Sequence, residues 1–597
     1  MASDPDIFSN AWATVLVLLF FGGSIFIHEL GHFLAAKLRG LKVLRFSVGF
    51  GPILFSRRGK DGCEYVLSAL PLGGYVAIPQ LADLGALEGT DGTEAKNLPK
   101  ASCLDKIIVS AAGALFNVLL AAVLAVFVWI FGVPSNDFET TTVVGYVSKT
   151  ITGADGKTVE SPAQKAGLMP GDKILSVDGS KVSDFLQIME KIAIGSGRTE
   201  SGAPKAVLEV ERGGKVFAVD VFPELVKTNA ASGDEMRMIG VSPAMTMKIS
   251  GLFPDSPAME AGAKPGDIVE SIDGRKLYSN MQLSDILAEI PEGKTVELGV
   301  IRGGNPVKLK IAPEKIALTK PLCKITLPDG AGSLSFISIP PKDPSAGAAE
   351  TVKLLSADTD DPRFAKISPG DILYQLALQR IESLSQLNAL VNANVGIVGG
   401  RMHFSGARMD LKSAYLPASS SSEILPPKEK MMLGYTLENV TVMRHPSVAE
   451  QFRDSVERTY SAIAGLANPQ SDIGISSLAG PVDIGRGIYR LSLTDISLML
   501  SFAVLLNINL AILNMLPIPV LDGGHIMFAI IEKIRGKPLP RSFFASVQAA
   551  FSILFIALMG YVVYLGFLRW NGDSEYESAA EQSSQYYIRD ISFKKHE

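Results

Sequence analysis

The sequence predicts a polytopic α-helical membrane protein, with four transmembrane helices and α+β domains inserted between the second and the third. Apolar residues make up 47% of the chain and its mean hydropathy is +0.25, which favours a membrane protein. Four apolar segments, approximately 12–36, 107–131, 496–516 and 543–568, reach the length of about 20 residues that a bilayer requires. The long region between the second and third segments contains repeated turn motifs instead.

Basic residues in the short loops set the expected orientation. Residues 37–106 contain ten Lys or Arg, the connection 533–541 contains four, and residues 1–11 contain none. Because Lys and Arg collect on the cytoplasmic side, we expect both basic loops in the cytoplasm. Both termini and the 132–494 region are then extracytoplasmic. The acidic start of the chain favours a retained first span over a cleaved signal peptide.

The first apolar segment contains the motif His-Glu-Leu-Gly-His, from His28 to His32. The chain has six histidines in total, and two of them fall in this motif. On a helix they share one face, so both imidazoles can reach one tetrahedral metal ion, with Glu29 beside them as a general base. Ionisable groups at membrane depth are costly and usually functional. The motif therefore indicates a zinc hydrolase that works within the bilayer.

A catalytic zinc site needs a third protein ligand, and the end of the third span offers two. Asp522 and His525 follow a run that is broken by Pro517 and Pro519. Irregular backbone at membrane depth is tolerated where it is buried in protein or lines a wet cavity, which fits an active site. Imidazole suits zinc better than carboxylate does, so these residues alone leave both candidates open.

The region between the second and third spans repeats one pattern. Ser-Pro-Ala, Ala-Gly, Pro-Gly-Asp and Asp-Gly follow one another over 161–179 and again over 256–274, and a weaker third copy without the Asp-Gly turn begins at Pro369. A short helix, a Gly-Asp turn, a strand and an Asp-Gly turn resemble permuted bacterial PDZ domains. Such modules bind extended peptides or C-termini at a sheet edge, here through loops expected near 144–146 and 239–241. The alternative is a spacer that binds nothing.

Together, these motifs resemble the site-2 protease family of intramembrane zinc metalloproteases, and the PDZ-like copies point to its RseP-type bacterial branch. The resemblance covers nearly the whole chain. Besides H-E-x-x-H, it rests on five segments: 49–52 and 71–75, which match a membrane-re-entrant β-hairpin, 112–117 in the second span, 478–482, and the N-x-x-P-x-P-x-L-D-G-G run over 514–524.

The resemblance implies that His28, His32 and Asp522 bind Zn²⁺ and that Glu29 is the catalytic base, so it favours Asp522 over His525. It also implies substrate contacts for Asn117, Asn514, Pro517, Pro519, Gly49 and Gly51. The 46–79 hairpin would offer an edge strand to an unwound substrate; an ordinary cytoplasmic hairpin is the alternative. Two departures stand out: Ala114 replaces the family's usual proline, and 316–440 is additional to the usual two PDZ copies.

The expected organisation has seven parts. These are spans one and two with the hairpin (1–134), PDZ-like domains (138–240 and 241–315), a degenerate third copy (316–440), an amphipathic periplasmic segment (446–493), spans three and four (494–570) and a flexible tail (571–597).

The expected function is a metalloendopeptidase of regulated intramembrane proteolysis in the bacterial inner membrane. Its partners would be the lipid bilayer and single-span membrane substrates such as anti-sigma factors or remnant signal peptides, with the repeats as a size filter. An inactive scaffold would have lost His28, Glu29, His32 or Asp522, and four spans leave little for the ion pathway of a metal-binding transporter. The sequence contains no dense basic patch of the kind that would indicate binding to nucleic acid. Its three cysteines are not spaced as metal ligands are.

Overall fold

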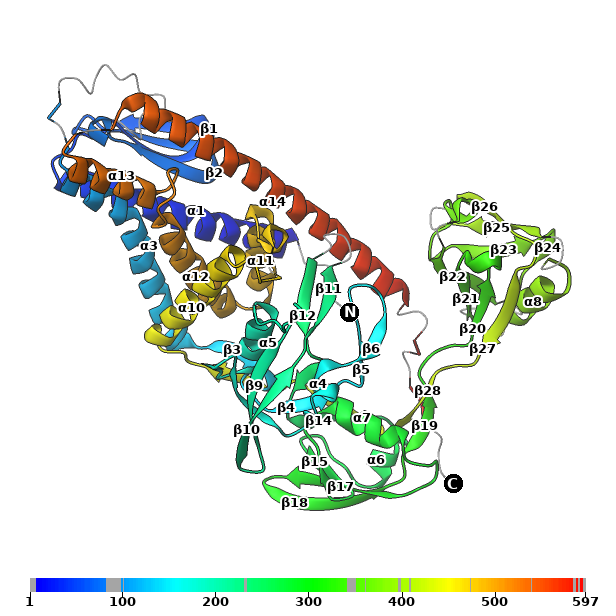
Figure 1. The fold of residues 1–597 in the computed structure, drawn as a ribbon. Helices are drawn as coiled ribbons and strands as arrows, with labels where there is room; N and C mark the ends of the chain where they lie inside the picture. The colour runs from blue at the N-terminus through cyan, green and yellow to red at the C-terminus, as the bar shows by residue number, and fades with distance from the viewer. Residues whose placement is uncertain are drawn as a thin grey trace.

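Four long apolar helices form one end of the molecule (Figure 1). In the computed structural model they are α1 Ile7–Leu38, α3 Cys103–Phe131, α12 Ile496–Asn514 and α14 Arg541–Ser583. Each contains an apolar stretch long enough to cross a membrane, which confirms the four predicted spans. The structure describes residues 7–81, 98–99, 101–229, 234–340, 350–359, 361–395, 399–406, 410–472, 474–537, 539–583, 587–588 and 591–593.

Small residues let these helices approach one another closely. A Cβ on Gly31 of α1 would lie only 2.8 Å from the carbonyl carbon of Ala112 in α3. Ala121 and Ala125 of α3 are fully buried against α12. Close backbone approach at small residues is the usual basis of helix packing in membranes, and here it brings α1, α3 and α12 together around one site.

Strands β1 Arg45–Arg58 and β2 Glu64–Ala77 follow α1 and fold back on themselves. The 45–48 part of β1 pairs with 74–77 on one side and with 64–67 on the other, and 53–58 pairs with 64–68. Phe46 packs its ring 5.2 Å from that of Phe33 on α1. The 74–77 segment is therefore an edge of a small sheet that is fixed to the end of α1.

The first two repeats share one order of elements. The first contains β4 Val144–Val147, β5 Thr150–Thr152, β6 Thr158–Glu160, α4 Pro162–Lys165, β7 Lys173–Val177, β8 Ser180–Lys181, α5 Phe185–Ala193, β9 Ala206–Arg212, β10 Lys215–Val221, β11 Glu224–Asn229, β12 Asp234–Met238 and β13 Val241–Pro243. The second contains β14 Met247–Leu252, α6 Pro257–Glu260, β15 Ile268–Ile272, β16 Arg275–Lys276, α7 Asn280–Ala288, β17 Val296–Arg302, β18 Asn305–Ile311 and β19 Glu314–Ala317, and it is completed by β28 Glu429–Met432 and β29 Tyr435–Glu438.

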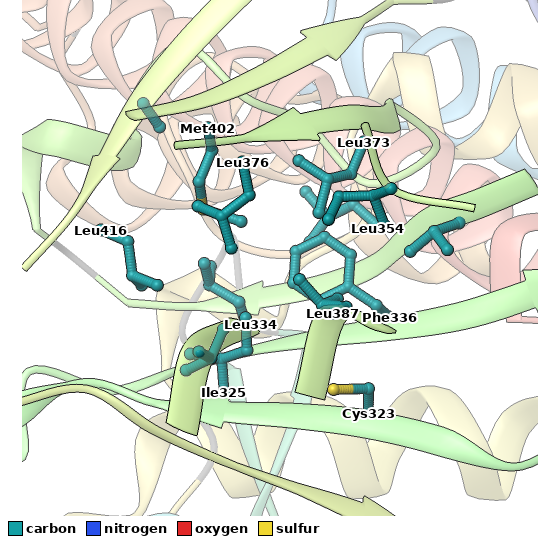
Figure 2. Packing of buried hydrophobic residues seen from close by; sticks show 14 of the residues in the cluster. Cys323, Ile325, Leu334, Phe336, Leu354, Leu373, Leu376, Leu387, Met402 and Leu416 are labelled. Carbon is teal, nitrogen blue, oxygen red and sulfur yellow. The ribbon is translucent and has the colours of Figure 1, made fainter. Parts of the chain in front are cut away.

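The third repeat is inserted into the second, between β19 and β28, and lies apart from the rest of the molecule (Figure 1). Its elements are β20 Leu322–Thr326, β21 Ser333–Ile339, β22 Thr351–Asp358, β23 Ile372–Leu376, β24 Gln379–Arg380, α8 Leu384–Leu390, β25 Gly400–Ser405, β26 Leu411–Leu416 and β27 Ser421–Leu425. Figure 2 shows its own core, in which Phe336, Leu373 and Met402 are fully buried. A separate core allows this repeat to fold as a unit.

One buried ion pair recurs in all three repeats. The aspartate of each Pro-Gly-Asp turn accepts a hydrogen bond from the backbone N–H three residues before it. The same aspartate pairs with a basic residue on a later strand: Asp172 with Arg212, Asp267 with Arg302, and Asp371 with Lys412. The third copy therefore keeps the pair although it lacks the Asp-Gly turn.

The observed strand pairing shows that two of the repeats end at other residues than predicted. Ile239 and Val241 belong to the core of the first repeat, so its boundary at 240 is wrong. Residues 429–438 pair with the second repeat, so a third repeat that extends to 440 is also wrong. The 239–241 loop closes the first repeat, because Ala163 N–H donates to Ile239 O; in the second repeat Ala258 N–H donates to Leu433 O. This closure could not be recognised from the sequence, because the strand that completes it comes later in the chain.

The remaining elements join the repeats to the spans. β3 Val133–Asn136 pairs with β30 Thr441–Arg444, and α10 Val448–Ala467, α11 Pro481–Thr494 and α13 Asp522–Arg535 complete the helical end. The prediction that residues 571–597 form a flexible tail is wrong as far as Ser583, because α14 continues to that residue. Beyond it, Tyr587 bridges to Thr319, and Phe593 is 7% exposed with its ring 5.9 Å from that of Phe253. Residues 584–586, 589–590 and 594–597 of that tail lie outside the described residues.

Candidate metal centre

Three predicted ligands from distant parts of the chain converge on one point. His28 and His32 are one turn apart on α1, and their Nε2 atoms are 3.1 Å apart. Asp522 Oδ2 lies 3.2 Å from His28 Nε2 and 3.5 Å from His32 Nε2. Ligand atoms arranged tetrahedrally at about 2.0–2.1 Å from zinc lie about 3.3–3.4 Å from one another. The three atoms therefore have the spacing that one zinc ion requires.

Two glycines place Asp522 at the centre. After α12 ends at Asn514, the chain turns over 515–521, and Asp522 begins α13. A Cβ on Gly523 would lie 2.5 Å from the carbonyl carbon of Met515, and one on Gly524 would lie 2.6 Å from that of Ile518. Neither position has room for a side chain, so the Asp-Gly-Gly sequence is what allows α13 to start this close to the end of α12.

His525, the alternative third ligand, lies outside this cluster. Among the described residues, His28, His32 and Asp522 form the only group of three or more His, Cys, Asp or Glu side chains that could hold a metal. The His525 ring instead lies 6.1 Å from the ring of Phe544. The geometry thus favours the carboxylate at this position.

The outer nitrogens of both histidines are held by α3. His32 Nδ1 lies 2.7 Å from the carbonyl oxygen of Val109, which can only accept, so His32 carries its proton on Nδ1 and leaves Nε2 for a metal. Asn117 is fully buried, with its amide 3.2 Å from His28 Nδ1, and its Oδ1 has no hydrogen-bond partner among the residues that the structure describes. With the amide turned so that Oδ1 faces the ring, Nδ1–H of His28 donates to it. That orientation satisfies the orphaned oxygen and leaves His28 Nε2 for the metal, so the residues present fit zinc.

Gly113 lets α3 lie against the centre. A Cβ at this position would be 2.7 Å from His28 Cε1 and closer still to His32 Nε2. Sequence reasoning missed Gly113 and Val109 as supports of the site. The available signal for Gly113 was a glycine inside an apolar span, within the matched 112–117 segment. The role of the Val109 carbonyl cannot be recognised from a sequence, because every residue has a backbone carbonyl.

Glu29 lies between the ligands and the β1–β2 sheet. It is half-buried and close enough to His28, His32 and Asp522 to interact electrostatically with all three. A Cβ on Gly74 would lie 3.0 Å from Glu29 Cγ, so the 74–77 edge segment runs directly beside this carboxylate. Gly74 was not among the predicted site residues, although the Gly-Gly pair in a strand was a signal of close approach.

The other predicted substrate residues fall at different distances from the centre. Asn514 Nδ2 is 3.3 Å from His28 Nε2. Pro517 is exposed and Pro519 is buried in the turn before α13. Gly49 and Gly51, with φ of +83° and +86°, lie where β1 bends between its two paired parts, and Gly74 is the glycine that adjoins Glu29.

Comparison with known proteins identifies the family. The sequence pattern of Peptidase family M50 matches residues 16–558, a range that contains the three converging residues. The chain belongs to peptidase family M50. It is a zinc-dependent membrane metalloprotease. The chain is 25% identical to the regulator of sigma-E protease RseP of Escherichia coli K12 over an alignment of 565 residues. This alignment covers 94% of the chain and 99% of that relative. A Pasteurella multocida protein named as a predicted zinc metalloprotease is 25% identical over 572 residues, 94% of this chain and 100% of its own length.

Proposed function

We propose that this metalloprotease cuts peptide bonds within the transmembrane segments of single-span membrane proteins, with His28, His32 and Asp522 as zinc ligands and Glu29 as catalytic base. The observation that carries the proposal is the convergence of the three ligand atoms among helices long and apolar enough to span a bilayer. A hydrolytic centre enclosed by spans is suited to bonds that are themselves within the membrane.

The chain's own residues supply proton transfer and orientation. Zinc, when bound, polarises the scissile carbonyl and lowers the pKa of water. Glu29 takes a proton from the attacking water and passes it to the leaving amide nitrogen, a contribution of about 10²–10⁴-fold in rate. Asn117 holds His28 in the required tautomer, and Asn514, within hydrogen-bonding distance of His28 Nε2, is placed to bind the substrate carbonyl.

The β1–β2 sheet supplies an edge for an unwound substrate. A transmembrane helix hides its backbone in internal hydrogen bonds, so the substrate must extend before hydrolysis. The 74–77 segment lies at a sheet edge with Gly74 against Glu29, and a strand paired there would run past the base. Exposed Ile53, Leu54 and Phe55 on the far part of β1 favour a hairpin that re-enters the membrane over an ordinary cytoplasmic hairpin.

The repeats act as PDZ-like modules that filter or bind substrates. In the first two, β13 and β29 follow the glycine loops of Gly240 and Gly434 and lie at sheet edges, where a peptide or C-terminus could add a strand. In the third, the equivalent strand β21 is already covered by β20, which also contacts α8. We assign peptide binding to the first two repeats. In the third repeat, the equivalent binding position is already occupied by the repeat's own strand β20.

The protease lies in a bacterial inner membrane with both termini and the repeats extracytoplasmic. The basic 37–106 and 533–541 connections support this orientation. The Escherichia coli relative is named regulator of sigma-E protease. Its similarity to this chain supports anti-sigma factors, together with remnant signal peptides, as the substrate classes to try first.

The test compares wild type with Glu29→Gln in liposomes that contain a model single-span substrate. We expect wild type and the surface control Glu260→Gln to cut inside the transmembrane segment, mapped by mass spectrometry. We expect Glu29→Gln to keep its zinc and to lose at least about 100-fold in rate. Equal cleavage by Glu29→Gln, or cuts confined to the soluble part of the substrate, would refute the mechanism. No cleavage by wild type would instead favour a scaffold or a metal transporter.

A further inference from the structure

Beyond α14, the described residues of the C-terminal tail lie against the second repeat. The apolar stretch of α14 ends at Asn571, and the helix continues for another 12 residues to Ser583, which is about 18 Å along its axis. Figure 1 shows this extension running from the spans toward the repeats. The tail segment, residues 587–588 and 591–593, follows it closely in the chain. The fourth span is therefore connected to the second repeat.

The tail segment first contacts the connection between the second and third repeats. Ile588 N–H donates to Leu318 O at 2.9 Å, and Tyr587 forms an antiparallel bridge with Thr319. On its other side, Leu318 N–H donates to Lys428 O at 2.8 Å. Leu318 and Lys428 lie on the two chain segments that lead into and out of the third repeat. The tail segment thus adds a third chain to this connection.

The tail segment then covers the glycine loop of the second repeat. Phe593 is buried, and its ring lies 5.9 Å from that of Phe253. Gly434 has a φ of +82°, and a Cβ on it would lie 2.8 Å from Phe593 Cζ. Phe253 N–H donates to Gly434 O at 3.0 Å, so the Phe593 ring lies on both chain segments that meet at this loop. Since β29 begins at the next residue, Phe593 lies where the edge of that strand starts.

The equivalent loop of the first repeat contacts residues of its own repeat instead. The atoms nearest to a Cβ on Gly240 would be those of Ser161 and Ser148. In the second repeat, Ser256 begins the short helix as Ser161 does in the first, and it lies close to Gly434 in the same way. Phe593 is therefore an addition to an arrangement that the two repeats share.

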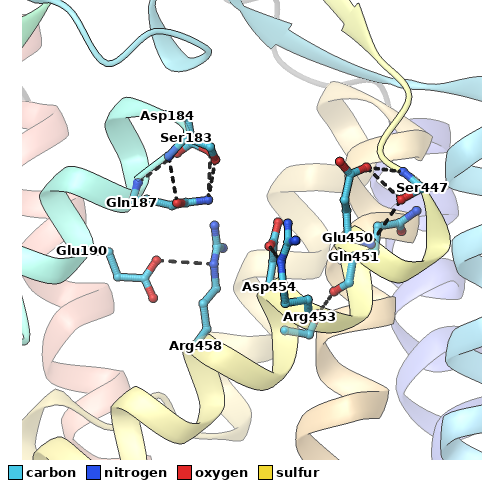
Figure 3. Close-up of polar contacts among 11 residues, drawn as sticks. Ser183, Asp184, Gln187, Glu190, Ser447, Glu450, Gln451, Arg453, Asp454 and Arg458 are labelled. Carbon is cyan, nitrogen blue, oxygen red and sulfur yellow. Dashed lines mark hydrogen bonds and ion pairs between the residues drawn. The ribbon is translucent and has the colours of Figure 1, made fainter. Parts of the chain in front are cut away.

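The first repeat is attached to the helical end through other contacts. Figure 3 shows Arg458 extended from α10 toward α5, where its Nε lies 3.3 Å from Glu190 Oε2. Asp472, after α10, accepts from Nε of Arg237 at 2.5 Å. These ion pairs attach the first repeat to the helical end through side chains, whereas the tail segment attaches the second repeat at its glycine loop.

We propose that the tail segment is a tethered ligand of the second repeat, which competes with other peptides for the Gly434 loop and the adjoining edge of β29. This inference rests on the proposed peptide binding of that repeat. A peptide that adds a strand to β29 has to lie beside Gly434, where Phe593 already lies. Binding of such a peptide displaces the tail segment and releases its pairing with Leu318, so it also frees the connection to the third repeat.

The tether allows even a weak ligand to occupy the loop. A short linker gives the linked ligand an effective concentration of about 1 mM. A tail segment that binds with a Kd of about 0.1 mM then raises the apparent Kd of a competing peptide about tenfold. Only peptides that bind the second repeat more tightly than the tail segment does displace it at ordinary concentrations. The tail segment thus sets a threshold of affinity for this repeat, and the first repeat has no equivalent contact among the described residues of the tail.

The test uses the full-length chain in detergent and a fluorescent peptide of residues 584–597 as the probe, with binding measured by anisotropy. We expect Phe593→Ala in the chain to bind the probe about tenfold more tightly than wild type does, because its own tail no longer occupies the loop. Ile588→Pro, which removes the N–H that Leu318 O accepts, should also increase binding. Ser592→Ala is the matched control, since the Ser592 side chain is exposed, and should bind the probe as wild type does.

A second probe, the same peptide with Phe593→Ala, should bind the Phe593→Ala chain at least about tenfold more weakly than the first probe, because an aromatic ring on the loop is lost. Unchanged probe affinity in both Phe593→Ala and Ile588→Pro chains, or equal binding of the two probes, would overturn the proposal. Binding is read without proteolysis. A chain that binds the probe as expected but binds no substrate peptide would contradict only the proposed peptide binding of substrates.

Discussion

Replacing Gly113 by alanine should damage the metal centre without changing any predicted ligand. The added methyl would lie 2.7 Å from His28 Cε1, whereas carbon atoms in contact prefer about 3.5–4.0 Å. Either α3 must move away or the imidazoles must shift, by roughly 1 Å in each case. Zinc sites keep their ligand distances within about 0.2 Å, so a shift of this size cannot be absorbed.

We therefore expect Gly113→Ala to lose zinc affinity by at least about tenfold and activity by about 100-fold. The assay is zinc content after dialysis, measured by atomic emission, together with cleavage of a single-span substrate in liposomes. Gly23→Ala is the matched control, because a Cβ on Gly23 of α1 meets nothing within 4 Å. Full zinc occupancy and normal cleavage in Gly113→Ala would refute the close packing of α3 on the ligands.

Three further predictions concern the repeats and the tail. Arg302 lowers the pKa of Asp267 in the folded state, so this pair stabilises the second repeat above about pH 4 and loses that effect as pH falls through the folded pKa. Arg302→Gln should speed amide hydrogen exchange in the second repeat at pH 7, and the stability of this repeat should then depend less on pH in the acidic range. A variant whose stability depends on pH as that of wild type does would contradict this. Leu378 is 87% exposed with φ of +69°, so Leu378→Gly should stabilise the third repeat by about 1 kcal/mol, read as a higher unfolding temperature, and a lower one would refute the strain. Phe593→Ala should release the tail and expose the Ile588 amide, which donates to a backbone carbonyl at 2.9 Å; slow exchange of that amide in the variant would show that Phe593 does not hold it.

The spans and the histidine pair were predictable because their signals are local. About 20 apolar residues in a row have few alternatives to a membrane helix, and His28 and His32 share a face through helix geometry alone. Asp522 could be proposed only with the help of a family resemblance, since nothing local separates it from His525. What separates them in space is the turn that Gly523 and Gly524 permit.

The closure of the second repeat could not be predicted, because its last strands come after the whole third repeat. Pairing between β14 and β29 joins residues nearly 190 positions apart, and period-2 patterns do not specify partners over such distances. The edge beside Glu29 was missed for a similar reason. Gly49 and Gly51 stay predicted substrate residues, and the irregular register of β1 and β2 places Gly74 beside the base.

The most direct test of the central claim is the zinc content of purified Asp522→Ala and His525→Ala. The geometry, with Asp522 Oδ2 3.2 Å from His28 Nε2, predicts that Asp522→Ala loses both zinc and cleavage while His525→Ala retains stoichiometric zinc. Zinc retained by Asp522→Ala and lost by His525→Ala would contradict the proposed centre.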